Sequence, residues 1–491
     1  MSLTRKKSLA LLLQQASESG LKRTLTAKSL VALGVGAIIG AGLFVRTAAA
    51  SAEAAGPAVT LSFIVAAIGC AFAGLCYAEF AAMIPIAGSA YTYAYTTMGE
   101  FVAWIIGWAL VLEYALGAAT VAISWSEYLN SLLGGRIPYE WCHSPLEANA
   151  AGVHGIFNAP ALLILALLTI LLIKGTQESA VVNMVIVIVK LSIVVAFVAL
   201  GWQFINHANL TPYLVPASVQ GHEGFFKHGW GGVLGGAGIV FFAFIGFDAV
   251  STAAQETKDP ARDMPIGIMG SLALCTVLYI LFGYVLTGIC NWQEFRAAGK
   301  EASVAYAVLH YMPGYAWLAT AITVAILAGF SSVILVMLMG QSRVFFSMAN
   351  DGLLPKLFSE IHPRFRTPYK CNLVLFVFVG LFAGFIPGSL AGDLTSIGTL
   401  FAFVLVCIGV LIMRRTDPAR ERPFRTPLVP VVPVLGILIC SGMIISLDSR
   451  TQLTAFLWML IGLAIYFLYS KSHSNLNRPL LQDQPEPAGS L

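Results

Sequence analysis

The sequence predicts an all-α protein that crosses a membrane many times, and three observations support this fold class. Of the 491 residues, 58% are hydrophobic and only 11% are charged, against roughly 25% charged residues in soluble domains. The apolar residues form long blocks, and a membrane-spanning helix needs about 20 of them. The blocks also lack the alternation of polar and apolar residues that is typical of membrane-spanning strands. We therefore expect a polytopic bundle of helices.

Twelve apolar blocks qualify as spans, although the fourth is short for a bilayer. The first block is longer than the apolar core of about 7–15 residues in a cleaved signal peptide, so we interpret it as a span. Residues 1–27 and 471–491 flank the spans as terminal segments. The predicted spans lie near 28–48, 57–83, 101–128, 159–173, 178–201, 231–252, 265–289, 313–340, 371–388, 392–413, 430–447 and 452–470.

Lysine and arginine predict the orientation, because loops on the cytoplasmic side carry an excess of them. With a cytoplasmic N-terminus, the inside segments hold 21 of the 28 basic residues. Both termini are therefore expected in the cytoplasm, with the chain in the cell membrane and lipid as its main partner. The net charge of +4 arises from this bias and does not indicate nucleic-acid binding. The six basic residues assigned to outside loops are Arg46, Arg136, Lys227, Arg296, Lys300 and Arg450.

Two spans, the first and the sixth, contain glycine-rich stretches at 34–44 and 235–248. In a single span, a face of small residues for helix packing would explain them equally well. Their recurrence five spans apart instead predicts two broken helices, which mark the binding site in many transporters. A repeat of five spans is inverted in the membrane. We therefore expect one repeat at 28–201 and a second at 231–413, with two further spans at 430–470.

Broken helices offer a way to bind an amino acid without charged side chains. Free N–H groups at a half-helix N-terminus favour a carboxylate, and free carbonyls at the other half-helix accept hydrogen bonds from an ammonium. No Lys, Arg, Asp or Glu occurs within 34–44 or 235–247. The two stretches therefore predict a site for the backbone groups of a zwitterion.

Several motifs carry a resemblance to a known family. The stretch Gly36-Ala-Ile-Ile-Gly-Ala-Gly-Leu-Phe44 resembles the first-span motif of the amino acid–polyamine–organocation superfamily. The resemblance covers residues 20–470 or so and implies the five-plus-five inverted-repeat fold, with coupled transport by alternating access. Pro85-Ile-Ala-Gly-Ser-Ala-Tyr-Thr-Tyr93 resembles the first cytoplasmic loop of that superfamily. Motifs similar to its cationic amino acid transporter branch begin at Phe241, Glu256, Arg343 and Pro423.

The resemblance also implies which residues bind the substrate. The carboxylate would meet the amides of Ala41 and Gly42. An alanine at position 41 departs from members with Ser or Thr there, so one side-chain hydrogen bond is missing. The ammonium would meet the carbonyls of Ile38, Phe242 and Ile245, with Phe242 as an aromatic gate and Ala243 in the same segment.

Lys190 is an ionisable residue near the middle of the fifth span. A charge at the bilayer centre costs ~2.5–3.5 kcal/mol on insertion scales, and the centre is too far from either interface for snorkelling. The side chain should therefore face the bundle interior. The resemblance implies that its ammonium replaces the Na⁺ of sodium-coupled relatives, near Ser331 or Ser332 and the first span. Burial disfavours the charged form, so we expect proton coupling rather than sodium coupling.

Three further residues are candidates for coupling or specificity. Glu113 and Asp248 lie within spans and are proton-coupling candidates, although a structural role as protonated carboxyls is an open alternative. Met337 in the eighth span stands where the resemblance places a small residue in mammalian cationic members. A thioether there would fill the space of a long cationic tail, unless it only packs against a neighbouring helix. We therefore expect small neutral substrates such as alanine, with arginine, lysine or ornithine as the alternative.

Other functional classes find little support. The chain lacks a GxxxxGK[ST] phosphate loop, an HExxH and a GxSxG motif, and its eight histidines fall in predicted loops or tails. Neither an enzyme nor a metal or other cofactor is expected. A channel would need a continuous polar path, and saturable counter-transport would exclude that alternative. Pairing of Cys142 with Cys290 and the oligomeric state are left open.

Overall fold

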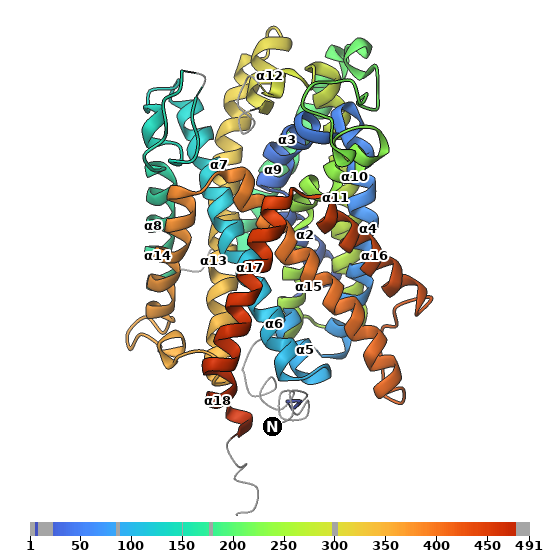
Figure 1. Ribbon diagram of the computed structural model, residues 1–491, viewed down its shortest axis with the longest axis vertical. Coiled ribbons are helices and arrows are strands. Elements are labelled where there is room, and N and C mark those ends of the chain that lie inside the picture. The colour runs from blue at the N-terminus through green and yellow to red at the C-terminus, as the bar shows by residue number, and fades with distance from the viewer. Residues whose placement is uncertain are drawn as a thin grey trace, which may run out of the picture.

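The computed structural model describes residues 5–7, 23–84, 89–149, 151–175, 180–296 and 303–477. Within these ranges the regular elements are all helical, apart from two isolated β-bridges. Figure 1 shows the helices packed side by side along the long axis of the molecule. The all-α prediction is confirmed. The α-helices are α2 (Ala27–Ile38), α3 (Thr47–Ala50), α4 (Val59–Met83), α5 (Ser89–Thr97), α6 (Glu100–Val111), α7 (Gly117–Leu132), α8 (Ala159–Lys174), α9 (Ala180–Gly201), α10 (Gly229–Val240), α11 (Pro260–Ile289), α12 (Ser303–Tyr311), α13 (Ala316–Asn350), α14 (Tyr369–Phe385), α15 (Gly388–Thr416), α16 (Val431–Ser446), α17 (Ser449–Ile465) and α18 (Lys471–His473).

Seven helical stretches in the described part of the chain are long and apolar enough to cross a membrane. They contain α4, α6 with α7, α9, α11, α13, α15 and α17. The shorter apolar helices are α2, α8, α10 with the turn after it, α14 and α16. The described part of the chain thus has several apolar helices long enough to span a membrane, as expected for a multi-pass membrane protein. The number of twelve spans stays a prediction.

The helices have an exposed apolar face suited to lipid and a buried face that packs against other helices. Along α8, Leu163, Leu167 and Ile170 are exposed at helical spacing, whereas Leu165 and Leu168 are buried. Such an exposed apolar stripe suits contact with acyl chains, in which apolar side chains need no cover. In the interior, α4 packs against α10, α11 and α16, and α13 packs against α7, α8 and α9. Segments far apart in sequence therefore meet around the glycine-rich stretches.

Both ends of the described chain lie at the same end of the bundle. The Lys7 ammonium is 2.8 Å from a carboxylate oxygen of Asp351, and the Arg5 guanidinium donates to the Leu476 carbonyl at 3.0 Å. In Figure 1, α5 and α18 lie at this lower end, and α12 lies at the upper end. We use lower and upper for these two ends below. Residues 1–4, 8–22 and 478–491, which the predicted terminal segments include, and residues 85–88 of the first loop motif lie outside the described residues.

Candidate functional site

The first span is interrupted within its glycine-rich stretch. Helix α2 ends at Ile38, and Ile39 takes an extended conformation with φ −73° and ψ 103°. The chain resumes as the π-helical turn Gly42–Arg46. Such turns are rare and are frequently found at functional sites.

The sixth span is interrupted in the same way but with a different backbone geometry. Helix α10 passes into the 3₁₀ turn Phe241–Phe244, after which Ile245 is extended with ψ 135°. Gly246 has φ +112°, a conformation that glycine adopts without the steric cost of a side chain. The 3₁₀ segment Asp248–Glu256 follows. Both breaks predicted from the glycine pattern are present.

The two breaks face each other in the interior of the bundle. A Cβ atom on Gly42 would lie 2.1 Å from the Cα atom of Ala243, so only glycine permits this backbone contact. The Tyr279 hydroxyl of α11 lies 3.0 Å from the Ile38 carbonyl and 2.9 Å from the Ala243 carbonyl. A hydroxyl has one hydrogen, so Tyr279 donates to one carbonyl at a time and links the two breaks. Sequence analysis missed Tyr279, whose only signal is a hydroxyl in an apolar span.

The predicted substrate-binding residues around the breaks come together. Two predicted ammonium acceptors have a donor within the protein, since the Ile38 carbonyl shares the Tyr279 hydroxyl with Ala243 and the Phe242 carbonyl accepts from the Ile245 amide at 3.3 Å. Each carbonyl keeps a second lone pair for a further donor. The buried residues at the breaks are Ile38, Ala41, Gly42, Phe242, Ala243 and Ile245.

Lys190 of α9, in the fifth span, is buried against the first and eighth spans. Only 3% of its surface is exposed, and its ammonium donates to the Gly36 carbonyl of α2 at 3.3 Å. On the other side it packs on Gly329 of α13, where a Cβ would come within 2.5 Å of the Lys190 Cε atom. Ser332 on the next turn of α13 is also buried, whereas the Ser331 hydroxyl donates to the Leu327 carbonyl within its own helix.

Comparison with known proteins identifies the family. The model of the amino acid permease family matches residues 25–476. The chain belongs to the amino acid permease family. The branched-chain amino acid permease BcaP of Bacillus subtilis is 43% identical over 483 residues, 97% of this chain and 99% of that protein. The methylthioribose transporter of the same organism is 40% identical over 480 residues, 97% of this chain and all of that protein. Human cationic amino acid transporter 4 is 33% identical over 399 residues, 81% of this chain and 60% of that protein.

Family membership confirms the resemblance seen in the motifs, and the names of these relatives describe transporters rather than enzymes. The relatives differ in the substrates for which they are named. Identity alone therefore does not select a substrate for this permease.

The two predicted acidic candidates of the permease are neighbours. Glu113 lies in a π-helical turn, Leu112–Leu116, between α6 and α7, and both it and Asp248 are fully buried. Tyr114, the residue after Glu113, donates its hydroxyl to Asp248 at 3.2 Å and so connects the two segments that carry the carboxyl groups. Two adjacent carboxylates in a buried site cannot both ionise without a large cost, so the pair is suited to holding a proton.

Met337 points into the bundle rather than toward lipid. A Cβ on Gly117 would lie 2.9 Å from the Met337 sulfur and 3.4 Å from a methyl group of Thr395. The thioether therefore lies between the third, eighth and tenth spans. Gly117 follows Glu113 by four residues, so Met337 packs against the helical stretch of the third span that also carries Glu113.

The expectation that Arg46 lies in an outside loop is wrong. Arg46 is 4% exposed and forms an ion pair with Asp393 of α15. Its Nε atom also approaches the Ile239 carbonyl of α10 at 3.5 Å. Arg46 is close to the predicted end of the first span at 48 and was counted with the following loop, whereas the helical backbone continues past it through α3. Cys142 and Cys290 are both free thiols, so they do not pair in this structure.

Proposed function

We propose that this permease is a secondary transporter of small apolar amino acids that works by alternating access. The observation that supports this most directly is the backbone contact between the two breaks at Gly42 and Ala243. It creates one site where the amides of Ala41 and Gly42 bind the substrate carboxylate and the carbonyls of Ile38, Phe242 and Ile245 bind its ammonium. Phe242 closes over the bound substrate.

The proposed architecture has twelve spans in the cell membrane, with repeats at 28–201 and 231–413 and two added spans at 430–470. Both termini face the cytoplasm, because the segments at the lower end carry most of the basic residues. The lower end of the bundle is therefore the inner end and the upper end is the outer end.

Protons are the proposed coupling ion, and Lys190 is the group that carries them. Its ammonium donates a hydrogen bond to the Gly36 carbonyl of the first span. The carbon chain of the same residue packs against Gly329 of the eighth span. Loss of the proton would weaken this link, so the charge on Lys190 connects proton binding to movement of the first span. Glu113 and Asp248 form a second proton-binding group between the third and sixth spans.

The substrate side chain is proposed to extend toward Met337. The thioether packs tightly against Gly117 and Thr395 and so occupies volume that a long side chain would need. A short apolar side chain is therefore the proposed substrate type, in keeping with the name of the BcaP relative. A specific observation favours a second candidate, a cationic substrate. Glu113 lies one turn from Gly117, so a long cationic tail would find a carboxylate if Met337 were smaller.

The test is competition by arginine against uptake of radiolabelled alanine in proteoliposomes. Leucine and alanine should compete in the wild-type protein, and arginine should not. Met337→Ser should bind arginine ~10-fold more tightly, as expected for about 1.4 kcal/mol gained from space and a nearby carboxylate. Strong arginine competition in the wild type would instead support the cationic candidate, and no gain in the variant would remove Met337 from the specificity site.

A further inference from the structure

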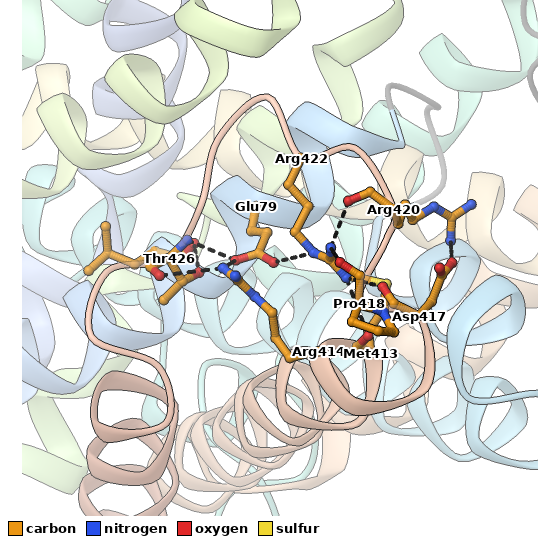
Figure 2. A network of polar contacts seen from close by, with 9 residues as sticks. Glu79, Met413, Arg414, Asp417, Pro418, Arg420, Arg422 and Thr426 are labelled. Atoms are coloured by element: carbon orange, nitrogen blue, oxygen red, sulfur yellow. Dashed lines mark hydrogen bonds and ion pairs between the residues drawn. The ribbon is translucent and has the colours of Figure 1, made fainter.

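A buried carboxylate lies near the inner end of α4, away from the substrate site. The Glu79 side chain has no exposed surface, and Figure 2 shows three donors converging on it. Arg414 approaches one oxygen at 2.9 Å, and the Thr426 amide donates to the same oxygen at 2.8 Å. Arg422 lies 3.3 Å from the other oxygen. All three donors belong to the end of α15 or to the connection that follows it.

This connection, residues 417–430 between α15 and α16, is here called the strap. Its fold is organised around the Arg422 guanidinium, which occupies the centre of Figure 2. One Arg422 nitrogen donates to the Met413 carbonyl at 3.3 Å and to the Asp417 carbonyl at 2.6 Å. The other donates to the carbonyls of Pro418 and Arg420. Arg422 therefore binds one carbonyl in the last turn of α15 and three in the strap, and it joins the strap to Glu79.

The sequence motif 423–427, which the transport site does not use, explains the shape of the strap. Pro427 disfavours a helical conformation at Thr426, so the Thr426 amide is free to donate to Glu79. The Thr426 hydroxyl donates to the Leu75 carbonyl of α4 at 3.1 Å. The strap thus holds α4 at two points that are one helical turn apart.

The same part of α4 contacts the broken sixth span. Tyr77, two residues before Glu79, packs edge-on against Phe247 with a centroid distance of 6.0 Å, and against Phe403 of α15 at 5.5 Å. Phe247 directly follows Gly246, the residue that forms the second break. A displacement of the inner end of α4 would therefore reach the break through a single side-chain contact.

The contacts just described between the strap and α4 are polar, and this makes the attachment reversible. Arg414 keeps 24% of its side chain exposed, so water already reaches one of the partners. Charged groups that separate into water regain hydration, whereas removal of one partner leaves the other buried and unpaired. A polar attachment of this kind can open as a unit.

We propose that the strap and Glu79 form the inner latch of the transporter. Glu79 is a positioning residue, which holds the inner end of α4 while the inner route is closed and separates from the strap when that route opens. The inference rests on the alternating-access cycle proposed above, but it does not depend on the substrate or the coupling ion.

The test measures inner accessibility in the absence of substrate. Ala253, which is buried in the segment after the second break, is replaced by cysteine in full-length protein without native cysteines. A membrane-impermeant maleimide is then applied to inside-out vesicles. Glu79→Gln should raise the labelling rate ~10-fold, within the usual range of coupling between sites. The matched control is Glu360→Gln, which removes an exposed ion pair with Lys370 at another loop of the lower end and should leave the rate unchanged.

Arg414→Gln provides a second variant in case Glu79→Gln does not fold. It removes one donor and should raise labelling by a smaller factor, ~5-fold, at the lower end of that range. Wild-type labelling rates in folded Glu79→Gln or Arg414→Gln, or an equal rise in Glu360→Gln, would overturn the latch. Because no substrate or gradient is present, a wrong choice of substrate would leave this result unaffected. Labelling that rises without any measurable transport would retain the latch and reject the proposed function.

Discussion

The two breaks look alike in sequence, yet their glycines act by different physical means. In the sixth span, Gly246 has φ +112°, and the break depends on a backbone conformation that other residues rarely adopt. In the first span, Ile39 forms the break in an ordinary extended conformation. There Gly42 is needed for close approach, because it touches the Ala243 backbone. A glycine-rich pattern thus predicts a break without revealing whether conformation or space requires each glycine.

The largest loss of transport is expected from a substitution of Gly42. In Gly42→Ala the new methyl group would lie 2.1 Å from the Ala243 Cα and 2.6 Å from its nitrogen. Backbone atoms cannot rotate away, so the two breaks must separate. A shift of about 1 Å at a reacting or binding centre can cost ~100-fold in rate, and we expect a loss of that size in initial uptake per folded protein.

The control for this variant is Gly442→Ala in α16, because nothing lies within 4 Å of the added methyl group. It should retain wild-type uptake. A Gly42→Ala protein that transports normally would show that the breaks do not need to touch.

A smaller effect is expected at Gly246. An alanine at this position would have to adopt a φ of +112°, which is unfavourable for a residue with a side chain. Its Cβ atom would also lie 2.9 Å from the Ala37 carbonyl oxygen. Such strain costs about 1–3 kcal/mol, so Gly246→Ala should lower apparent substrate affinity and thermal stability without abolishing transport. The measurement is a thermal shift with and without substrate.

Gly40→Ala is a third substitution for this comparison, because the nearest atoms to its new methyl group all belong to the Val333 side chain, the closest at 3.2 Å. That side chain can yield, and we expect a change of less than about 0.5 kcal/mol, as for ordinary substitutions away from a special backbone position. If Gly40→Ala is as harmful as Gly246→Ala, the distinction between the two breaks fails.

The helices and the breaks were predictable from sequence because both leave local signals. Long apolar blocks are required wherever helices meet lipid, and glycine clusters interrupt them. The burial of Lys190 was also predictable, because a charge at mid-membrane must face the interior. The resemblance placed it near the first span, but its contact with the Gly36 carbonyl is visible only in the structure.

Contacts between distant spans were not predictable in this way. Glu113 and Asp248 were identified separately, but their proximity depends on how the third and sixth spans pack, which helical periodicity does not encode. Tyr279 gave no signal beyond its hydroxyl, and its role is visible only once both breaks are placed beside it. Arg46 was assigned to a loop because its charge suggested a span end, whereas Asp393, far along the chain, stabilises it inside the bundle.

Proton-driven transport through the site at the two breaks can be tested directly in one experiment. Uptake of radiolabelled alanine into proteoliposomes is measured with an inward proton gradient, with and without sodium, for the wild type and Lys190→Ala. The account predicts accumulation that follows the proton gradient and ignores sodium in the wild type. Lys190→Ala should lose this accumulation while still binding substrate. Uptake that requires sodium, or accumulation that persists in Lys190→Ala, would contradict it.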